Sequence, residues 1–280
     1  MTVLVTGANG MIGSMLVKAL ADAGIKVIGV DRTEKEDIIQ ADLGDKELVK
    51  KIIRTNNIDR IIHLAALAHT EGEQDLSWER YYHVNVECAK NVFEAAGTIP
   101  VLYISTIDVY GFYDGKKKVT VDTPIKPVSC YGNSKAMAED ECKKNPCYTI
   151  FRLSPVYTDT VKRDIQKRYY LKYPNLAYQI GKGSHYEILN INRAVAEMVA
   201  WCSKAPKNDT RIIKDELPMW TPDYIKAEKE AGRAKTVLKI PRWMVVAGYT
   251  VLKAILGENE KTYLLNKAVH PLKTELSEEK

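Results

Sequence analysis

Tyr131 and Lys135 are spaced so that a phenol and an ammonium would lie one turn apart on the same face of a helix. A lysine charge at that distance stabilises a phenolate relative to the neutral phenol. A tyrosine supported in this way can transfer a proton to or from a substrate oxygen. The pair therefore predicts general acid/base chemistry.

The spacing alone does not identify the pair, because it recurs at Tyr113/Lys117, Tyr178/Lys182, Tyr249/Lys253 and Tyr263/Lys267. Position in the chain distinguishes Tyr131, which opens a helical pattern between two strand-like segments, Val101–Ser105 and Tyr148–Leu153. The first of these segments leads into Ser105 and Thr106, whose hydroxyls can hydrogen-bond a substrate oxygen. We expect these groups to meet at one site.

A glycine-rich turn occupies residues 5–13, after a strand-like segment and before an amphipathic helix. Gly7 allows a tight turn, Gly10 lets backbone amides approach a pyrophosphate, and Gly13 allows the helix to pack close to the strand. The helix N-terminus adds free N–H groups and the positive end of the helix dipole. The pattern predicts a dinucleotide site whose turn comprises Gly7, Asn9, Gly10, Met11, Ile12 and Gly13.

Asp31 ends the second strand-like segment, at the distance from the glycine turn that suits a ribose-binding carboxylate. A carboxylate there accepts hydrogen bonds from both ribose hydroxyls and repels a 2′-phosphate, which favours NAD. Arg32 could accept that phosphate instead. We therefore expect NAD, with NADP as the alternative.

Short apolar runs alternate with helical patterns through the first half of the chain. The expected strands are Val3–Thr6, Lys26–Val30, Ile38–Gln40, Arg60–Leu64, Val101–Ser105 and Tyr148–Leu153, and one long helix is expected over residues 84–96. This alternation predicts an α/β fold with a doubly wound parallel sheet, which binds ligands beyond the carboxyl ends of its strands. Residues 1–155 are expected to form this domain, with 186–203 packing back onto it.

Residues 156–185 and 204–280 are expected to form a small C-terminal substrate-binding cap. Its best substrate signal is the basic, tyrosine-rich stretch 162–173, where Arg163 and Arg168 could grip a diphosphate and tyrosines could stack on a base. A solvated amphipathic helix explains the same residues equally well. The apolar segment from Trp243 to Leu256 is interpreted as a docked core helix, with a membrane-surface role as the less favoured alternative.

Composition excludes several classes of function. The net charge of +5 is spread along the chain without a nucleic-acid-binding motif, so no nucleic-acid partner is expected. The five cysteines form no CxxC pair, which argues against a metal site or disulfide framework and favours a reducing compartment. No signal peptide or membrane-spanning run is recognised, so we expect a cytoplasmic enzyme with a small-molecule substrate and no membrane partner.

In order along the chain, several motifs together resemble the extended short-chain dehydrogenase/reductases, the NAD-dependent epimerase/dehydratase group that acts mostly on nucleotide sugars. They are Thr6–Gly13, Asp42-Leu43, His63-Leu64-Ala65-Ala66, Asn85-Val86, Ser105-Thr106 through Val109-Tyr110-Gly111, and Tyr131-Gly132-Asn133-Ser134-Lys135. The resemblance covers about the first 155 residues well and the remainder loosely. It implies a Rossmann-like fold.

The resemblance also implies residue roles. Thr106 would be the catalytic threonine with Ser105 as its neighbour, Tyr131 the general acid/base, and Lys135 a ligand of the nicotinamide ribose. The remaining implied cofactor contacts are Asp42 and Leu43 at the adenine, Leu64, Ala65 and Ala66 along the cofactor, and Asn85. Helices near 84–96 and 131–144 would form a homodimer interface.

The sequence departs from the family pattern at two places, and one of them bears on the type of reaction. Cys88 stands where the family usually has glycine, and Ile107-Asp108 replaces the adjacent Asp-Glu pair of the dehydratases, which disfavours dehydration. His63 is interpreted as a packed structural histidine, and His69 as a solvated loop residue, with the substrate cleft as its alternative. Two other functions stay open: reduction of a hydrophobic steroid-like or phenolic ketone, and non-catalytic dinucleotide sensing.

Overall fold

The computed structural model describes residues 1–68 and 77–275, except for the side chain of Arg163. The chain divides into two compact units, which we call the large-sheet unit and the small-sheet unit. The large-sheet unit consists of Met1–Val109, Ser129–Leu153 and Asn192–Arg211. The small-sheet unit consists of Tyr110–Val128, Ser154–Ile191 and Ile212–Lys280.

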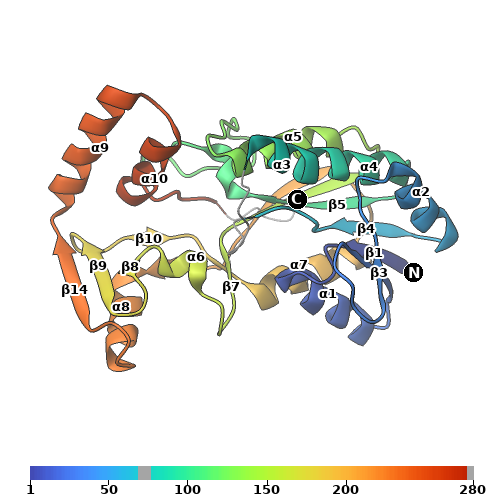
Figure 1. Cartoon of the computed structure of the whole chain (residues 1–280), viewed down its shortest axis with the longest axis horizontal. Helices are drawn as coiled ribbons and strands as arrows, with labels where there is room; N and C mark the ends of the chain where they lie inside the picture. The colour runs from blue at the N-terminus through green and yellow to red at the C-terminus, as the bar shows by residue number, and fades with distance from the viewer. Residues whose placement is uncertain (69–76, 276–280) are drawn as a thin grey trace. The chain divides into compact units, whose positions relative to one another are not determined.

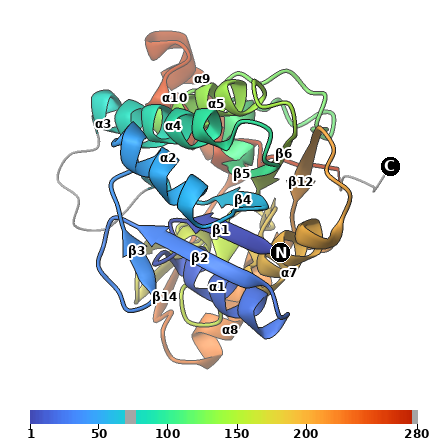
Figure 2. The same ribbon diagram turned by 90° about the vertical axis from the view of Figure 1, so that its right-hand side faces the viewer.

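A seven-stranded sheet forms the centre of the large-sheet unit, in the order β12-β6-β5-β4-β1-β2-β3 (Figure 2). Its strands are β1 Thr2–Thr6, β2 Lys26–Asp31, β3 Ile38–Gln40, β4 Arg60–His63, β5 Val101–Thr106, β6 Tyr148–Leu153 and β12 Asp209–Ile213. Strands β1 to β6 pair in parallel. Strand β1 lies between β2 and β4, so the chain continues toward one edge of the sheet after β1 and toward the other edge from β4 onward. Parallel sheets of this kind bind ligands at the point where the strand order reverses.

Helices cover both faces of this sheet, as the unbroken apolar strands require (Figure 1). Helices α1 Met11–Asp22 and α7 Ile191–Ser203 lie on one face (Figures 1 and 2). The other face carries α2 Lys46–Thr55, α3 Trp78–Tyr82, α4 Cys88–Ala96 and α5 Cys130–Cys142. The doubly wound parallel sheet predicted from the sequence is confirmed.

The single helix expected over residues 84–96 is wrong in detail. The structure has α3, then a π-helical turn at His83–Glu87, then α4. Within the π turn lies Asn85, which is buried and hydrogen-bonded to two other elements. π-helical turns are rare and often occur at functional sites, and apolar periodicity does not reveal them.

The small-sheet unit has a three-stranded sheet of β14 Thr236–Ile240, β9 Leu176–Ile180 and β8 Tyr170–Lys172, in that order. Two short pairs join β7 Val156–Tyr157 to β11 Leu189–Asn190, and β10 His185–Tyr186 to β13 Met219–Trp220. Its helices are α6 Arg163–Gln166, α8 Thr221–Glu230, α9 Arg242–Leu256 and α10 Glu260–Val269. An aromatic-rich core includes Tyr169, Tyr170 and Tyr186.

The division into units differs from the expected one. Residues 204–280 were assigned to the cap, but β12 lies at the edge of the large sheet beside β6. Residues 110–128, expected in the dinucleotide domain, group with the small-sheet unit, where Tyr113 is bonded to Asn266. Local sequence pattern does not reveal which strand β12 pairs with, because pairing is decided by tertiary structure.

Helix α9 also differs from expectation. The segment is helical, but Trp243 is 70% exposed and Ile255 is 72% exposed, while Tyr249 is buried. It is therefore not a docked core helix in this structure. Apolar composition predicted its helicity but not its burial, because burial depends on a neighbouring surface.

Candidate active site

The glycine turn after β1 is packed so closely that two of its glycines leave no room for a side chain. Gly7 has a positive φ of 71°, and a Cβ there would lie 2.7 Å from the backbone nitrogen of Ala65. A Cβ on Gly13 would lie 2.1 Å from the carbonyl oxygen of Gly7. Only glycine fits at these two positions, whereas a Cβ on Gly10 would meet that oxygen at 3.2 Å. The turn is thus kept open and close to the sheet.

Asp31 ends β2 beside this turn. Its Oδ2 accepts a hydrogen bond from the backbone N–H of Asn9 at 3.0 Å, and its Oδ1 accepts from the hydroxyl and the N–H of Thr33. The Asn9 side chain donates to the Thr33 carbonyl at 2.8 Å. The carboxylate is therefore oriented at the carboxyl edge of the sheet, while Arg32 is exposed next to it.

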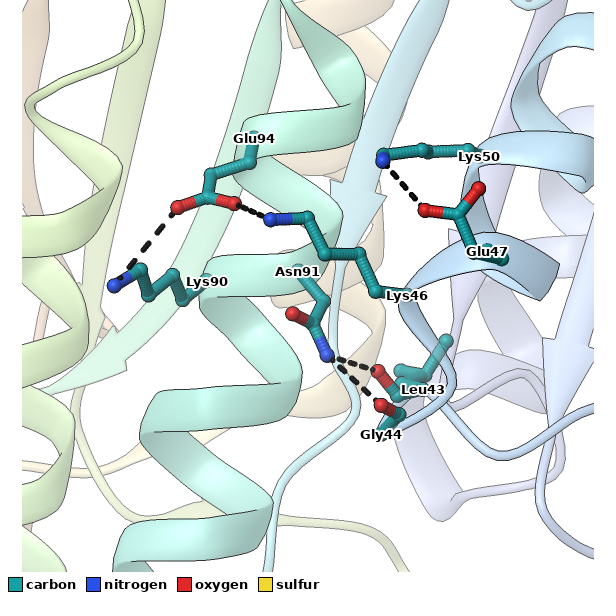
Figure 3. Close-up of polar contacts among 8 residues, drawn as sticks. All are labelled: Leu43, Gly44, Lys46, Glu47, Lys50, Lys90, Asn91 and Glu94. Atoms are coloured by element: carbon teal, nitrogen blue, oxygen red, sulfur yellow. Dashed lines mark hydrogen bonds and ion pairs between the residues drawn. The ribbon is translucent and has the colours of Figure 1, made fainter.

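The Asp42–Leu43 turn is anchored to α4. Asn91 donates from its side-chain amide to the carbonyl oxygens of Leu43 at 2.9 Å and Gly44 at 3.2 Å (Figure 3). An ion pair between Lys46 and Glu94 joins α2 to α4 close by (Figure 3). Leu43 is half-buried against the core, and Asp42 is exposed. These contacts fix the turn that the resemblance assigns to the adenine.

Asn85 holds the loop that follows β4. Its Oδ1 accepts from the N–H of Leu67 at 2.6 Å, and its Nδ2 donates to the Leu67 carbonyl at 3.0 Å and to Ser134 Oγ at 2.9 Å. Leu64 and Ala65 are half-buried, and Ala66 is exposed. The side-chain amide of Asn85 is thus engaged by protein, so Asn85 positions this loop against α5 rather than presenting its amide to a cofactor.

Lys135 lies on α5 with its side chain buried; the residue is only 2% exposed. Its Nζ lies 4.4 Å from the ring centroid of Tyr103 on β5. Burial lowers the pKa of Lys135 to about 7, while the charge of Glu139 opposes that shift. The ammonium therefore exists in an environment where it can lose its proton near neutrality.

Hydrogen bonds connect the start of α5, where Tyr131 lies, to the turn that contains Thr106. Ser129 caps the helix by accepting from the N–H of Gly132 at 2.9 Å, and it donates to Asp108 Oδ2 at 2.5 Å. The N–H of Asp108 in turn donates to Thr106 Oγ1 at 3.2 Å. Thr106 ends β5, and Tyr131 lies in the first turn of α5.

The Ser105 side chain is directed toward α5. Its hydroxyl donates to Glu139 Oε1 at 2.6 Å, and the residue is buried. Arg152 on β6 donates to both oxygens of the same carboxylate, at 3.0 Å and 2.7 Å. The structure therefore gives Ser105 a place in a buried ion-pair cluster, in contrast to the expected substrate contact.

His63 is a packed histidine, as expected. The ring is buried, Nδ1 lies 2.8 Å from Thr6 Oγ1, and the ring stacks on Tyr103 with centroids 5.9 Å apart. Burial, followed by the charge of Lys135, lowers the pKa of His63 to about 3. His69 lies outside the described residues.

Cys88 is also buried, and burial raises the pKa of its thiol to about 11. It is a packed thiol at the start of α4, so the departure from the family glycine is accommodated.

The stretch 162–173 is not one amphipathic helix and does not offer all its tyrosines for stacking. Tyr169 and Tyr170 are buried in the core of the small-sheet unit, and Tyr170 donates to Glu228 at 3.0 Å. Arg168 lies over the ring of Tyr186, 5.1 Å from its centroid. Nothing is described for the side chain of Arg163.

Sequence reasoning missed Glu139 and Arg152. The available signal was a carboxylate four residues after Lys135 on an expected helix, facing the next strand. Among the residues that the structure describes, no group of three or more acidic, histidine or cysteine side chains could hold a metal. In the same part of the chain, no helix is long and apolar enough to cross a membrane.

Comparison with solved structures places the fold. The UDP-glucuronic acid 4-epimerase from Bacillus cereus, solved with NAD, superposes with a TM-score of 0.69 at 24% identity, over 85% of this chain and 87% of that one. At this level of identity the likeness bears on the fold.

Sequence comparison finds curated relatives among sugar-nucleotide epimerases. A putative UDP-arabinose 4-epimerase from Arabidopsis thaliana is 36% identical over 159 residues, 49% of this chain and 36% of that protein. UDP-glucose 4-epimerase from Neisseria meningitidis is 32% identical over 175 residues, 54% of this chain and 51% of that protein. The chain thus matches between about a third and a half of the length of these relatives.

The sequence model of the NAD dependent epimerase/dehydratase family matches residues 3–193. That range holds the glycine turn, Asp31, Thr106 and the Tyr131–Lys135 helix, all within the large-sheet unit. The match spans more than half of the chain and all of the site described above. The chain therefore belongs to the NAD-dependent epimerase/dehydratase family.

Proposed function

We propose that the protein is an NAD-dependent epimerase or oxidoreductase acting on a carbinol or ketone of a nucleotide sugar, with UDP-sugars as the class to test first. Family membership supports the cofactor, and the names of the curated relatives support the substrate class. The observation that carries the proposal is the buried Lys135 one turn from Tyr131, on a helix tied through Ser129 and Asp108 to the turn of Thr106.

The residues present fit NAD. Gly7 and Gly13 allow the turn after β1 and the start of α1 to pack closely, where a Cβ would overlap backbone atoms, and Asp31 offers a carboxylate at the end of β2. In this proposal the turn at Asn9–Ile12 binds the pyrophosphate, Asp31 the adenosine ribose and Asp42-Leu43 the adenine. Lys135 binds the nicotinamide ribose. NADP stays the alternative because Arg32 is exposed beside Asp31.

The chemistry follows from the side chains. Tyr131, as phenolate, takes the proton of a substrate hydroxyl, and the Lys135 ammonium stabilises that phenolate. Thr106 Oγ1 accepts from the Asp108 N–H, which leaves its own O–H to donate to the substrate oxygen. Bound NAD would supply a hydride acceptor for the carbon that carries this hydroxyl and could give the hydride back to the resulting ketone. Return to the opposite face of the ketone gives the epimer; release of the ketone gives net oxidation.

We predict that Tyr131→Phe lowers kcat roughly 10²- to 10⁴-fold, the usual contribution of a general acid/base. NAD affinity should stay nearly unchanged, because the variant removes only the hydroxyl. Turnover of UDP-glucose and NAD titration by calorimetry provide the two measurements. Tyr178→Phe is the matched control: this tyrosine has the same spacing to a lysine but bonds the Lys167 carbonyl. Full activity of Tyr131→Phe excludes the assigned role.

The substrate class is tested by thermal stability with added ligands. A ligand at 100 times its Kd stabilises the fold by about 2.7 kcal/mol. We expect stabilisation by NAD and a further increase with UDP-glucose or UDP-glucuronic acid. A steroid ketone is the comparison ligand, and stabilisation by it alone supports the hydrophobic-ketone reductase instead.

We also propose a homodimer formed through α4 and α5. On α5, Met137 is 39% exposed, and α5 packs beside α4 on one face of the sheet (Figure 2). The five cysteines are free, which supports a reducing compartment, and the cytoplasm is the proposed location.

A further inference from the structure

Glu139 is a buried carboxylate that the proposed reaction steps do not use. It lies one turn after Lys135 on α5 and has no solvent exposure. Its Oε1 accepts from Ser105 Oγ at 2.6 Å and from Arg152 Nε at 3.0 Å, and its Oε2 accepts from Arg152 Nη2 at 2.7 Å. All four residues belong to the large-sheet unit.

Stability alone explains this cluster poorly. Removing two charges from water is costly, and well-packed apolar residues often replace a buried ion pair at no loss of stability. Arg152 is also buried, so neither charge of the pair keeps the hydration that lowers the free-energy cost of a surface ion pair. A buried anion beside the helix turn of Lys135 has a further consequence, because it acts on the charge of that lysine.

Within the part of the chain that the structure describes, charged and titratable groups near Lys135 lie on α5, β5, β4 and β6. Tyr131 and Glu139 lie on α5, Tyr103 on β5 lies under the ammonium, and His63 on β4 is kept neutral by burial. Arg152 on β6 is bound to Glu139. Glu139 is the carboxylate of this set, and its charge favours the protonated lysine, whereas burial favours the neutral one.

We propose that Glu139, held in place by Arg152 and Ser105, is a positioning residue that keeps Lys135 in its ammonium form beside Tyr131 and thereby sets the pH range of the reaction. The need for the ammonium rests on the proposed function. The coupling between Glu139 and Lys135 rests on their one-turn spacing on a buried face of α5, and it does not depend on that function.

The coupling is tested on the full chain without substrate. Protein labelled with [ε-¹³C]lysine is titrated by NMR, and the Lys135 signal is assigned by its loss in Lys135→Met. We expect the midpoint of Lys135 to fall by about one pH unit or more in Glu139→Gln, because the favourable charge is lost. Glu139→Asp keeps the carboxylate and should retain most of the parent midpoint. An unchanged or higher midpoint in Glu139→Gln overturns the proposal.

Glu139→Gln leaves the Arg152 charge buried without its partner, which is a destabilising change. If that variant does not fold, Glu139→Gln/Arg152→Gln removes both charges together. The Lys135 midpoint should still fall in the double variant, because Glu139 rather than Arg152 acts on Lys135. A double variant that titrates like the parent contradicts the inference.

The consequence for the reaction is read from the pH dependence of kcat/KM with UDP-glucose and NAD. In Glu139→Gln, we expect the alkaline limb of the kcat/KM profile to move to lower pH by as many units as the NMR midpoint of Lys135. In Glu139→Asp, that limb should stay near its position in the parent protein. Uniform loss of activity at every pH, with the limb unmoved, indicates a merely structural role and overturns the proposal. A shifted NMR midpoint in a protein that turns over no sugar nucleotide shows that the coupling stands and that the proposed function fails.

Discussion

Lys135 is placed where two physical effects oppose each other. Burial favours its neutral form, and the carboxylate of Glu139 favours its charged form. The outcome is a lysine that titrates close to neutrality, within the range in which an acid/base site operates. A surface lysine at the same spacing from a tyrosine, such as Lys182 after Tyr178, has no comparable burial.

His63 predicts a dependence of stability on pH. Its pKa is lowered from 6.5 to about 3 in the fold, so below pH 6.5 the unfolded chain binds a proton that the folded chain does not. Stability from this residue is therefore present above pH 6.5 and is lost as the pH falls toward 3.

The free energy of unfolding should fall by roughly 2 kcal/mol between about pH 7.5 and pH 5 because of His63. Denaturant unfolding at both pH values measures it, with His63→Asn as the variant that lacks the titrating ring but can still bond Thr6 Oγ1. The variant should lose less stability on acidification. An equal loss in parent and variant shows that other groups dominate the acid response.

Asp31 predicts the choice between the two nicotinamide cofactors. Asp31→Asn should weaken NAD about 10- to 100-fold, because hydrogen bonds to a charged group contribute about 1.5–3 kcal/mol. The affinity for NADP should fall less than that for NAD, or rise, because the variant no longer repels the 2′-phosphate of NADP. Calorimetric titration with both cofactors measures this. Arg32→Ala is the neighbouring control, and a larger loss of NAD affinity there than in Asp31→Asn refutes the ribose assignment.

At the scale of elements, the first turn of α1 packs closely against the turn after β1, and this packing requires glycine at position 13. A Cβ on Gly13 would overlap the Gly7 carbonyl oxygen, and overpacking of this kind costs about 1–3 kcal/mol or more. A Cβ on Gly10 would lie 3.2 Å from the same oxygen, a tight contact that a small shift can relieve. The close packing of α1 therefore depends on Gly13, and we propose that Gly10 instead leaves space for a ligand.

Three glycine substitutions test this distinction. Gly13→Ala should lower Tm strongly in the absence of cofactor, whereas Gly10→Ala should lower Tm much less but weaken NAD binding. Gly248→Ala in α9, where no atom lies within 4 Å of the added Cβ, should be neutral or stabilising by about 0.5–1 kcal/mol. Thermal unfolding with and without NAD separates these cases. Equal effects of Gly10→Ala and Gly13→Ala would show that the turn has one function.

Buried and half-buried polar side chains connect the elements of the large-sheet unit. Asn85 joins the loop after β4 to α5, and Asn91 joins the turn after β3 to α4. Each amide satisfies backbone groups that would otherwise be unpaired where no strand or helix continues. The turns assigned to the cofactor are therefore fixed by residues outside those turns.

At the scale of the whole molecule, the proposed dimer makes one prediction. Met137→Glu places a charge in the proposed α4–α5 interface and should convert the dimer to monomer, because charges are depleted at interface cores. Light scattering coupled to size exclusion measures the mass. Ile255→Glu on the exposed face of α9 is the control and should leave the mass unchanged. Dissociation by Ile255→Glu alone would move the interface to α9.

The sequence by itself determined the parallel sheet, the glycine turn and the helical spacing of Tyr131 and Lys135. Alternating apolar and amphipathic segments are local signals, and so are a glycine that needs positive φ and a tyrosine one turn from a lysine. The positions of β1–β6 and of Gly7 and Gly13 follow from such signals.

Tertiary structure alone decided what each side chain faces. It directed Ser105 to Glu139 instead of outward, used the amide of Asn85 within the protein, placed β12 in the large sheet and left Trp243 exposed. Each of these outcomes depends on partners distant in the chain, whose hydrogen bonds and contact surfaces exist only after folding. No spacing or periodicity within one segment contains that information.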